Sequence, residues 1–171
     1  MRRFIFPLAT LPIMAGLSMQ LRAADFDNTP LESFDLTRYL GKWYEIARFD
    51  HSFERGLSQV SAEYVLMDND KIKVINEGVK NGKTKTAIGK AFRPEAEDEP
   101  ALIRVSFFLF FYSDYRILWI DPDYQLVLVG GSSKNYLWIL SRSPKIEKAA
   151  LDHIVSIASS KGYDTAKLIF N

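Results

Sequence analysis

The sequence predicts an all-β protein with one α-helix: an eight-stranded antiparallel up-and-down β-barrel, a C-terminal helix packed outside it and a short final strand. Two observations support this fold class. Eight segments with strand patterning follow one another through short turns, and no helical pattern lies between them. The period then changes to helical spacing near the C-terminus. A chain of 171 residues is long enough to bury a sizeable core as one domain.

The first residues predict a targeting signal that is not part of the fold. Arg2 and Arg3 precede an apolar stretch broken by prolines, and Ala23 offers a small residue for cleavage. We therefore expect a signal peptide over residues 1–23 and a single domain over residues 24–171, with an uncleaved N-terminal anchor as the alternative. Cleavage would lower Lys+Arg from 22 to 19 against 21 Asp+Glu, a net charge of −2 that gives no reason to expect nucleic-acid binding.

The first expected strand, residues 41–49, is largely apolar on both faces. Trp43, Glu45, Ala47 and Phe49 alternate along one of them. Packing on both sides of a strand is typical of a barrel wall that has a filled or ligand-holding interior and a helix outside.

The other strands follow in order, separated by turn signals. A helical turn capped by Asp35 precedes the first strand. Asn81 and Gly82 mark a tight hairpin between the third and fourth strands. An acidic loop, residues 94–100, separates the fourth strand from the fifth. The seven remaining strands are expected at residues 60–66, 72–77, 83–93, 103–107, 115–120, 124–129 and 135–141.

Helical spacing begins after the eighth strand and predicts one helix along the outer wall of the barrel. Pro144 suits the start of this helix and Gly162 its C-terminal cap. A last short strand, residues 167–170, would then add to an edge. The recurring apolar positions of the helix are Ile146, Ala150, Ile154 and Ile157.

An eight-stranded barrel is just wide enough to hold one small ligand. Alternation along the strands predicts an inward set that is mostly apolar with few polar groups, as ligand cavities usually are. The alternative is a fully packed barrel without a cavity. The expected ligand-binding residues are Ala47, Ala62, Tyr64, Val74, Asn76, Val105, Phe107, Ile117 and Trp138.

The link between the fifth and sixth strands, residues 107–112, is apolar and contains neither Gly nor Pro. Leu109, Phe110 and Phe111 are expected to project at this link, where an exposed apolar patch marks a membrane or protein contact. We therefore predict membrane docking or a homodimer interface at these three residues. Burial under the protein's own loops is the alternative.

Composition and spacing do not favour catalysis or metal binding. The sequence contains 0 Cys, which excludes a thiol nucleophile and a thiolate metal site. His51 and His153 are the only histidines, and neither has metal-ligand spacing with another donor. We expect no catalytic residue, metal or cofactor, with a haem held by an axial histidine as the alternative. Glu45, on the inward face, is either an orienting group for a polar head group, a buried acid or an ordinary structural carboxylate.

Three stretches, taken in their order, resemble the sequence motifs of the lipocalin family. Residues 41–44 (Gly-Lys-Trp-Tyr) are similar to the first motif. Residues 121–124 (Asp-Pro-Asp-Tyr) resemble the second, with Pro where Thr is usual, and residues 140–142 (Leu-Ser-Arg) resemble the third. The longer stretches 43–51 and 136–142 are similar to the bacterial outer-membrane lipocalin subfamily, known as Blc.

The resemblance implies that Gly41, Trp43 and Arg142 close one end of the barrel, with the arginine packed over the indole. The mouth of the cavity would then lie at the opposite end from Trp43. The resemblance also implies that the ligand is a fatty acid or a lysophospholipid, with Tyr112 and Trp138 near its acyl chain.

The resemblance runs from about residue 34 to residue 170 and implies a non-enzymatic protein that stores or transports a lipid in the bacterial cell envelope. The alternative is an enzyme of the lipocalin type that acts on a lipid or isoprenoid substrate. Members of the subfamily commonly carry a lipobox cysteine as a membrane tether, and this sequence has none. We therefore expect an exported protein that is periplasmic or secreted, with association with the outer membrane as the alternative.

Overall fold

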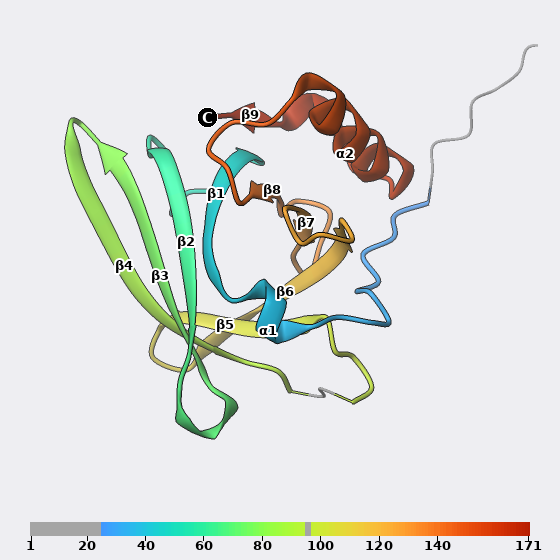
Figure 1. Cartoon of the computed structure of the whole chain (residues 1–171). Helices are drawn as coiled ribbons and strands as arrows, with labels where there is room; N and C mark the ends of the chain where they lie inside the picture. Colours follow the sequence, from blue (N-terminus) through green and yellow to red (C-terminus); the bar gives the residue numbers. More distant parts are fainter. Residues whose placement is uncertain (1–24, 95–96) are drawn as a thin grey trace, which may run out of the picture.

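Eight antiparallel strands form a closed barrel in the computed structural model, which describes residues 25–94 and 97–171 (Figure 1). This confirms the predicted fold class. The strands pair in sequence order, and β1 closes the barrel because it pairs with both β2 and β8. The predicted signal peptide, residues 1–23, lies outside the described residues. The strands are β1 (Gly41–Arg48), β2 (Ser58–Leu66), β3 (Ile72–Lys80), β4 (Lys83–Phe92), β5 (Leu102–Phe108), β6 (Phe111–Ile120), β7 (Leu126–Gly130) and β8 (Leu137–Ser141).

The turns use the residues that the sequence indicated. Asn81 and Gly82 both have positive φ, at 53° and 70°, as the expected tight hairpin between β3 and β4 requires. Between β6 and β7, Asp121 Oδ1 accepts a hydrogen bond of 2.7 Å from the backbone N–H of Gln125. The link between β2 and β3 contains a single 3₁₀ turn, η1 (Asp68–Asp70).

One end of the barrel is plugged by α1 (Leu36–Tyr39), a single helical turn that precedes β1. Asp35 caps this turn as predicted, since its side chain accepts hydrogen bonds from the backbone N–H groups of Thr37 and Arg38. In an up-and-down barrel the links after odd-numbered strands share one end. The long β1–β2 loop and the β3–β4, β5–β6 and β7–β8 turns therefore surround the opposite end, which we call the mouth.

The outer wall carries α2 (Lys148–Ser160), which begins close to where the helical spacing of the sequence begins. Its residues Ile154 and Ala158 are fully buried against the outward faces of the strands. After the short 3₁₀ turn η2 (Thr165–Lys167), the final strand β9 (Ile169–Phe170) pairs antiparallel with β1, so the predicted final strand is present but shorter than residues 167–170. Two cores result, one inside the barrel and one between the barrel and α2.

A β-bulge in β1 changes which residues face the interior. Against β8, Glu45 pairs with Leu140 and Ala47 pairs with Ile139, so β1 has one extra residue between the two pairs. A bulge shifts the alternation of inward and outward side chains by one residue. Trp43 and Glu45 therefore face the interior, whereas Ala47 packs in the outer core. The prediction that Ala47 lines the pocket was wrong for this reason.

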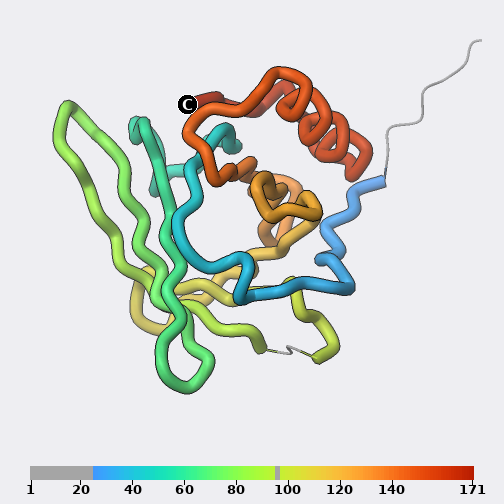
Figure 2. Tube along the Cα trace, in the orientation of Figure 1, coloured from blue at the N-terminus to red at the C-terminus, as the bar shows by residue number. Residues whose placement is uncertain are grey.

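The β3–β4 hairpin extends away from the rest of the barrel at the mouth. The two strands pair along their whole length, but β4 pairs with β5 only through Lys90, Ala91 and Phe92. Figures 1 and 2 both show the hairpin standing apart from the neighbouring strands. Gly89 lies where β4 leaves β5, and a Cβ atom there would be 2.7 Å from the carbonyl oxygen of Ser106. The separation leaves one side of the mouth open.

Candidate functional site

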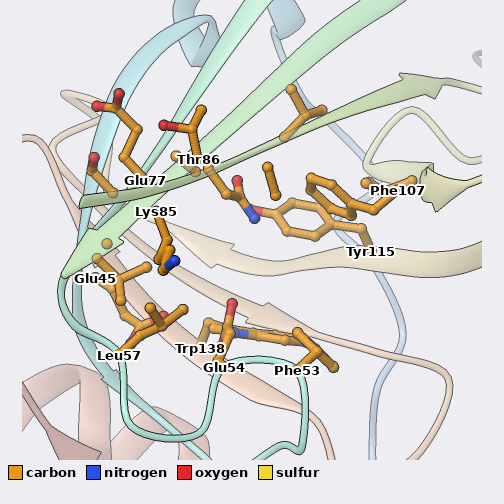
Figure 3. A pocket seen from close by; sticks show the side chains of 18 of the residues that line it. Glu45, Phe53, Glu54, Leu57, Glu77, Lys85, Thr86, Phe107, Tyr115 and Trp138 are labelled. Carbon is orange, nitrogen blue, oxygen red and sulfur yellow. The ribbon is translucent and has the colours of Figure 1, made fainter. Parts of the chain in front are cut away.

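The barrel encloses a cavity of about 600 Å³ that opens at the mouth. Its wall is mostly apolar and comes from seven of the barrel strands and from the loop between β1 and β2. In Figure 3, Tyr115 and Phe107 lie on one side of the cavity, and Trp138 and Phe53 lie on the other. A volume of this size is within the usual range for pockets that bind small molecules.

Seven of the predicted ligand-binding residues lie in the cavity wall. They come from four different strands, so the barrel topology brings them together from distant parts of the sequence. Their role in binding remains a prediction. The seven residues are Ala62, Tyr64, Val74, Asn76, Val105, Phe107 and Trp138.

Three predicted residues are not in the cavity wall. Ala47 faces the outer core because of the bulge in β1. Ile117 belongs to the inner core but is fully buried in the filled closed end of the barrel, below the open volume. Tyr112 lies between Phe111 and Ser113, which both line the cavity, so its side chain points to the other face of β6. There it packs edge-on against Phe92, with ring centroids 5.2 Å apart.

The cavity wall also contains residues that the pattern of alternation missed. Phe53, Glu54 and Leu57 come from the irregular loop between β1 and β2, which covers part of the mouth. A loop has no periodicity from which inward residues can be predicted. Glu45 did carry a signal, because the alternation placed it on the inward face of β1, and it lines the cavity.

The closed end of the barrel is sealed by Arg142 and Trp43. The guanidinium carbon lies 3.9 Å from the centre of the indole ring. The same guanidinium donates hydrogen bonds of 2.7–3.1 Å to four carbonyl oxygens of the turn between α1 and β1, those of Arg38, Tyr39, Leu40 and Lys42. This is the contact that the family resemblance implied.

Gly41 is the third member of the predicted closure. Its φ of +93° is one that L side chains rarely adopt, and a Cβ atom there would be 3.4 Å from the Arg142 guanidinium. Glycine therefore lets the chain turn from α1 into β1 directly beneath the arginine. The Trp43 indole N–H donates to the Tyr39 carbonyl oxygen at 2.8 Å, which ties the plug to the strand.

Three tyrosine hydroxyls meet where the cavity reaches its closed end. Tyr115 Oη lies 2.6 Å from Tyr39 Oη, and Tyr64 donates to Tyr115 Oη at 2.8 Å. Burial raises the pKa of Tyr64 to about 12 and raises the pKa values of Tyr39 and Tyr115 well above their usual range, so all three hydroxyls are neutral. The inner end of the cavity is therefore uncharged.

A charged cluster lies in the wall nearer the mouth. Arg48 Nη1 donates to Glu45 Oε1 at 2.6 Å, and Arg48 Nε is 3.6 Å from Glu54 Oε2. The Trp138 indole N–H donates to the same Glu54 oxygen at 3.1 Å, and the C-terminal residue Asn171 donates to Glu45 Oε1 at 2.6 Å. The cluster joins β1, β8, the β1–β2 loop and the end of the chain.

Burial changes the protonation of this cluster. Desolvation, with the charge of Glu45 as a second cause, raises the pKa of Glu54 to about 7. Desolvation also raises the pKa of Glu45, against the opposing effect of Arg48. His51 has its pKa lowered to about 4 by desolvation and by the charge of Arg48, so its imidazole is neutral at pH 7.

Glu54→Gln is expected to stabilise the protein at pH 8 by roughly 1–3 kcal/mol. The folded Glu54 has its pKa at about 7 and the unfolded one near 4.5, so its contribution to stability is full below pH 4.5 and is lost as the pH rises through 7. Glutamine keeps the neutral form at every pH. Urea unfolding of both proteins at pH 4.5 and pH 8 measures the difference, which should be close to zero at pH 4.5.

His51 shifts stability in the opposite direction, because its lowered pKa means that stability is lost as the pH falls from 6.5 to 4. The histidine is present in both proteins, so its effect cancels when the variant is compared with the wild type. A Glu54→Gln protein that is less stable than the wild type at pH 8 would contradict the raised pKa.

The mouth is bordered by the aromatic patch, residues 107–112. Phe110 is 83% exposed, Phe111 75% and Leu109 61%, so these side chains are not covered by the protein's own loops. Leu109 and Phe110 form the turn, and Phe111 already belongs to β6, because Phe108 pairs with Phe111. The hairpin is therefore tighter than the predicted loop, and the patch is continuous with the cavity wall.

Neither histidine of the chain lies in the cavity wall. Across residues 25–94 and 97–171, no three His, Cys, Asp or Glu side chains are grouped so that they could hold a metal ion. None of the helices in the same residues has both the length and the apolar character needed to cross a membrane.

Comparison with known proteins places the chain among related sequences. The Lipocalin-like domain family matches residues 34–171. The chain is 43% identical to outer membrane lipoprotein Blc of Vibrio cholerae, over 82% of this chain and 84% of that protein. It is 44% identical to the protein of the same name from Escherichia coli K12, over 83% of this chain and 81% of that protein.

Two more distant matches come from a plant and an insect. Temperature-induced lipocalin-1 of Arabidopsis thaliana is 36% identical, over 81% of this chain and 78% of that protein. The crystal structure of insecticyanin from the tobacco hornworm Manduca sexta superposes with a TM-score of 0.69, over 88% of this chain and 87% of that one. The identity to insecticyanin is 24%, so this likeness concerns the fold alone.

Proposed function

This chain belongs to the lipocalin family, and from that premise we propose that it binds a lipid in its barrel cavity and stores or transports it in the bacterial cell envelope. The observation that carries the proposal is the mostly apolar cavity of about 600 Å³. The relatives at 43% and 44% identity are named outer membrane lipoproteins, which supports a location in the envelope and association with the outer membrane.

The shape of the cavity supports a ligand with a long apolar chain and one polar end. The inner end is walled by aromatic rings and neutral hydroxyls, whereas charged groups lie near the mouth. An acyl chain would bury its apolar surface at the inner end, and a polar head group would face the mouth. A fatty acid or a lysophospholipid has this form.

The test is the lipid content of the purified protein. We expect organic extraction and mass spectrometry to yield about one long-chain lipid per barrel. Adding a fatty acid to delipidated protein should change tryptophan emission until the sites are filled, because Trp138 lines the cavity. Trp138→Phe should lose that change and still bind the fatty acid in equilibrium dialysis. No extracted lipid and no saturable binding would contradict the proposal.

No observation on the described residues favours the enzymatic alternative. Lipocalins are generally binding proteins, and neither His51 nor His153 lies in the cavity wall, where a histidine base would have to act. The same placement leaves a haem in the cavity without an axial histidine from this chain.

We further propose that the aromatic patch, residues 107–112, contacts an anionic membrane surface. The exposed Lys90 lies beside the patch, with Nζ 6.0 Å from the centre of the Phe110 ring and 5.7 Å from the centre of the Tyr112 ring. Apolar rings and lysines together bind anionic lipid surfaces. Leu109 has φ +49°, an unfavourable conformation for leucine, so an apolar side chain is kept there at a cost in stability.

Replacing both Phe110 and Phe111 with serine is expected to reduce binding to vesicles of anionic phospholipid by about tenfold or more, because two rings leave the interface. Co-sedimentation with the vesicles measures the binding. Leu66→Ser with Met67→Ser is the matched control, because these residues are 49% and 52% exposed at the closed end. A loss of dimers in analytical ultracentrifugation instead would assign the patch to a homodimer interface.

A further inference from the structure

We propose that the cavity selects lipids whose polar end carries an ammonium group, held between the carboxylates of Glu45 and Glu54 and the aromatic rings beside them. This inference rests on the proposed lipid-binding function and deepens it, because it names the chemistry of the head group. It favours amines and aminolipids over free fatty acids.

The first argument is the balance of charge in the buried cluster. Glu45, Arg48 and Glu54 have side chains that are 2%, 3% and 10% exposed, so two carboxyls share one guanidinium. Arg48 is already engaged, since Nη1 donates to Glu45 and Nη2 to the carbonyl oxygens of Glu54 and Leu57. One negative charge is therefore left without a cation in a poorly solvated place, where an unpaired charge is costly.

The second argument is that neighbouring cations do not neutralise this charge. The imidazole of His51 is neutral at pH 7 because its pKa is lowered to about 4. Lys80 and Lys85 also line the cavity, but both are exposed at its rim, and Lys80 Nζ donates to the carbonyl oxygen of Arg55. Among the ion pairs of the described residues, Arg48 is the cation that reaches Glu45 and Glu54.

The other acidic groups of the wall are already paired at the edge of the cavity. Glu77 pairs with Lys42 at 3.7 Å, and Asp114 pairs with Arg116 at 2.8 Å. The uncompensated charge is thus confined to the Glu45–Glu54 pair.

The third argument is the set of oxygen atoms left free. Both carboxyls line the cavity, and the hydrogen bonds of the described residues reach only Glu45 Oε1 and Glu54 Oε2. Glu45 Oε2 and Glu54 Oε1 therefore lack a donor, although the Glu45 side chain is only 2% exposed. An ammonium group supplies N–H donors and a positive charge together, which a hydroxyl, a carboxylate or a phosphate does not.

The fourth argument is the aromatic surface beside these oxygens. Figure 3 shows Glu54 against Trp138, with Phe53 next to them. The ring of His51 stacks on Phe53, with ring centroids 5.1 Å apart, and lies tilted against Trp138 at 4.6 Å, so the rings form one continuous group. Aromatic faces attract cations, including quaternary ammonium groups. The same faces give no such attraction to a carboxylate.

The test is a series of ligands that share one alkyl chain and differ at the polar end. We expect wild-type protein at pH 7.5 to bind dodecylamine at least about tenfold more tightly than dodecanol, and dodecanoate no more tightly than dodecanol. Displacement of a fluorescent lipid reporter measures the three affinities. Glu54→Gln should bring the ratio of amine to alcohol affinity to within about threefold of one.

Glu63→Gln is the matched control, because it makes the same charge change on an exposed outward residue of β2 and should leave the ratio unchanged. Equal affinities for amine and alcohol in the wild type would overturn the inference. A ratio that survives Glu54→Gln would overturn it as well. Binding of dodecanol to both proteins shows that they are folded and that the cavity accepts lipid, whereas failure of all three ligands to bind would contradict the proposed function itself.

A second measurement needs no variant. The pKa of Glu54 is raised to about 7, so at pH 6 the carboxyl is mostly protonated, and an ammonium group that binds beside it would expel most of one proton. Calorimetric titration of wild-type protein with dodecylamine in two buffers of different ionisation enthalpy measures the protons released. We expect release with the amine and none with dodecanol. Amine binding without proton release would overturn the inference.

Discussion

Arg142→Ala is expected to lower the free energy of unfolding by about 2–4 kcal/mol and the melting temperature by roughly 5–15 °C. The guanidinium is the shared donor for four carbonyl oxygens of the turn between α1 and β1, and it covers the face of Trp43. Alanine would leave those carbonyls without their donor and open the sealed end of the barrel to water. Thermal and urea unfolding measure the loss.

Arg104→Ala is the matched control for this prediction. Arg104 is half exposed on β5 and makes one long ion pair of 3.5 Å with Asp114, so its loss should cost less than about 1 kcal/mol. Arg142→Lys should recover only part of the stability, since an ammonium group cannot reach four carbonyls and cover a ring at once. If Arg142→Ala melts like Arg104→Ala, the contact does not close the barrel.

Ligand affinity should respond less than stability to Arg142→Ala. The arginine lies at the closed end, and it is not part of the cavity wall. A fatty acid should therefore bind to folded Arg142→Ala with an affinity within about threefold of the wild type, a change of less than 1 kcal/mol. Equilibrium dialysis well below the melting temperature measures this.

Ala62→Trp is expected to weaken fatty-acid binding by about a hundredfold or more. Ala62 lines the cavity from β2, opposite Trp43 on β1 and Asn76 on β3. An indole at this position would occupy the volume that an acyl chain needs. The cavity has room for the ring, so the melting temperature should fall by only a few degrees. Fluorescence titration and equilibrium dialysis measure the affinity.

Glu63→Trp is the control, because it puts the same ring on the next residue of β2, which is exposed and points outward. Its affinity for the fatty acid should stay within about threefold of the wild type. If Ala62→Trp binds the fatty acid as tightly as the control does, the ligand does not use the volume beside Ala62.

Much of the fold could be predicted because local patterns carry it. The alternating segments predicted eight strands in order, and Asn81 and Gly82 predicted the hairpin between β3 and β4. Asp35 predicted the cap of α1, since its side chain bonds backbone groups two and three residues away. Each of these predictions depends on residues close together in the sequence, and the structure confirms them.

Predictions of the site were right where strands are regular and wrong where they are not. Seven expected residues of β2, β3, β5 and β8 line the cavity, because they lie on the inward face that alternation assigns to them. The prediction for Ala47 failed because a bulge in β1, opposite Leu140 and Ile139 of β8, reverses the alternation of inward and outward side chains. The prediction for Ile117 failed because alternation gives a face of the sheet and does not say how far down the barrel the open volume extends. Tyr112 was expected from the family resemblance and not from alternation, and its side chain lies on the other face of β6.

The Glu45–Glu54 pair could not be predicted as a unit. Glu54 enters the cavity from an irregular loop, and its pKa of about 7 depends on desolvation by the folded wall around it. An aspartate or glutamate in a loop is ordinarily solvated and ionised, so nothing in the local sequence marks this one as buried. Asn171, at the other end of the chain, also contacts the pair.

The sequence alone determined the barrel and its closed end. Strand alternation, turn chemistry and the two short motifs that contain Trp43 and Arg142 are each properties of short stretches of chain. The tertiary structure alone decided which side chains line the cavity and which charges they carry there. The bulge in β1, the depth of the cavity and the burial of two carboxyls around Arg48 arise when distant segments pack together. Desolvation and close contact act between those segments and are absent from the extended chain.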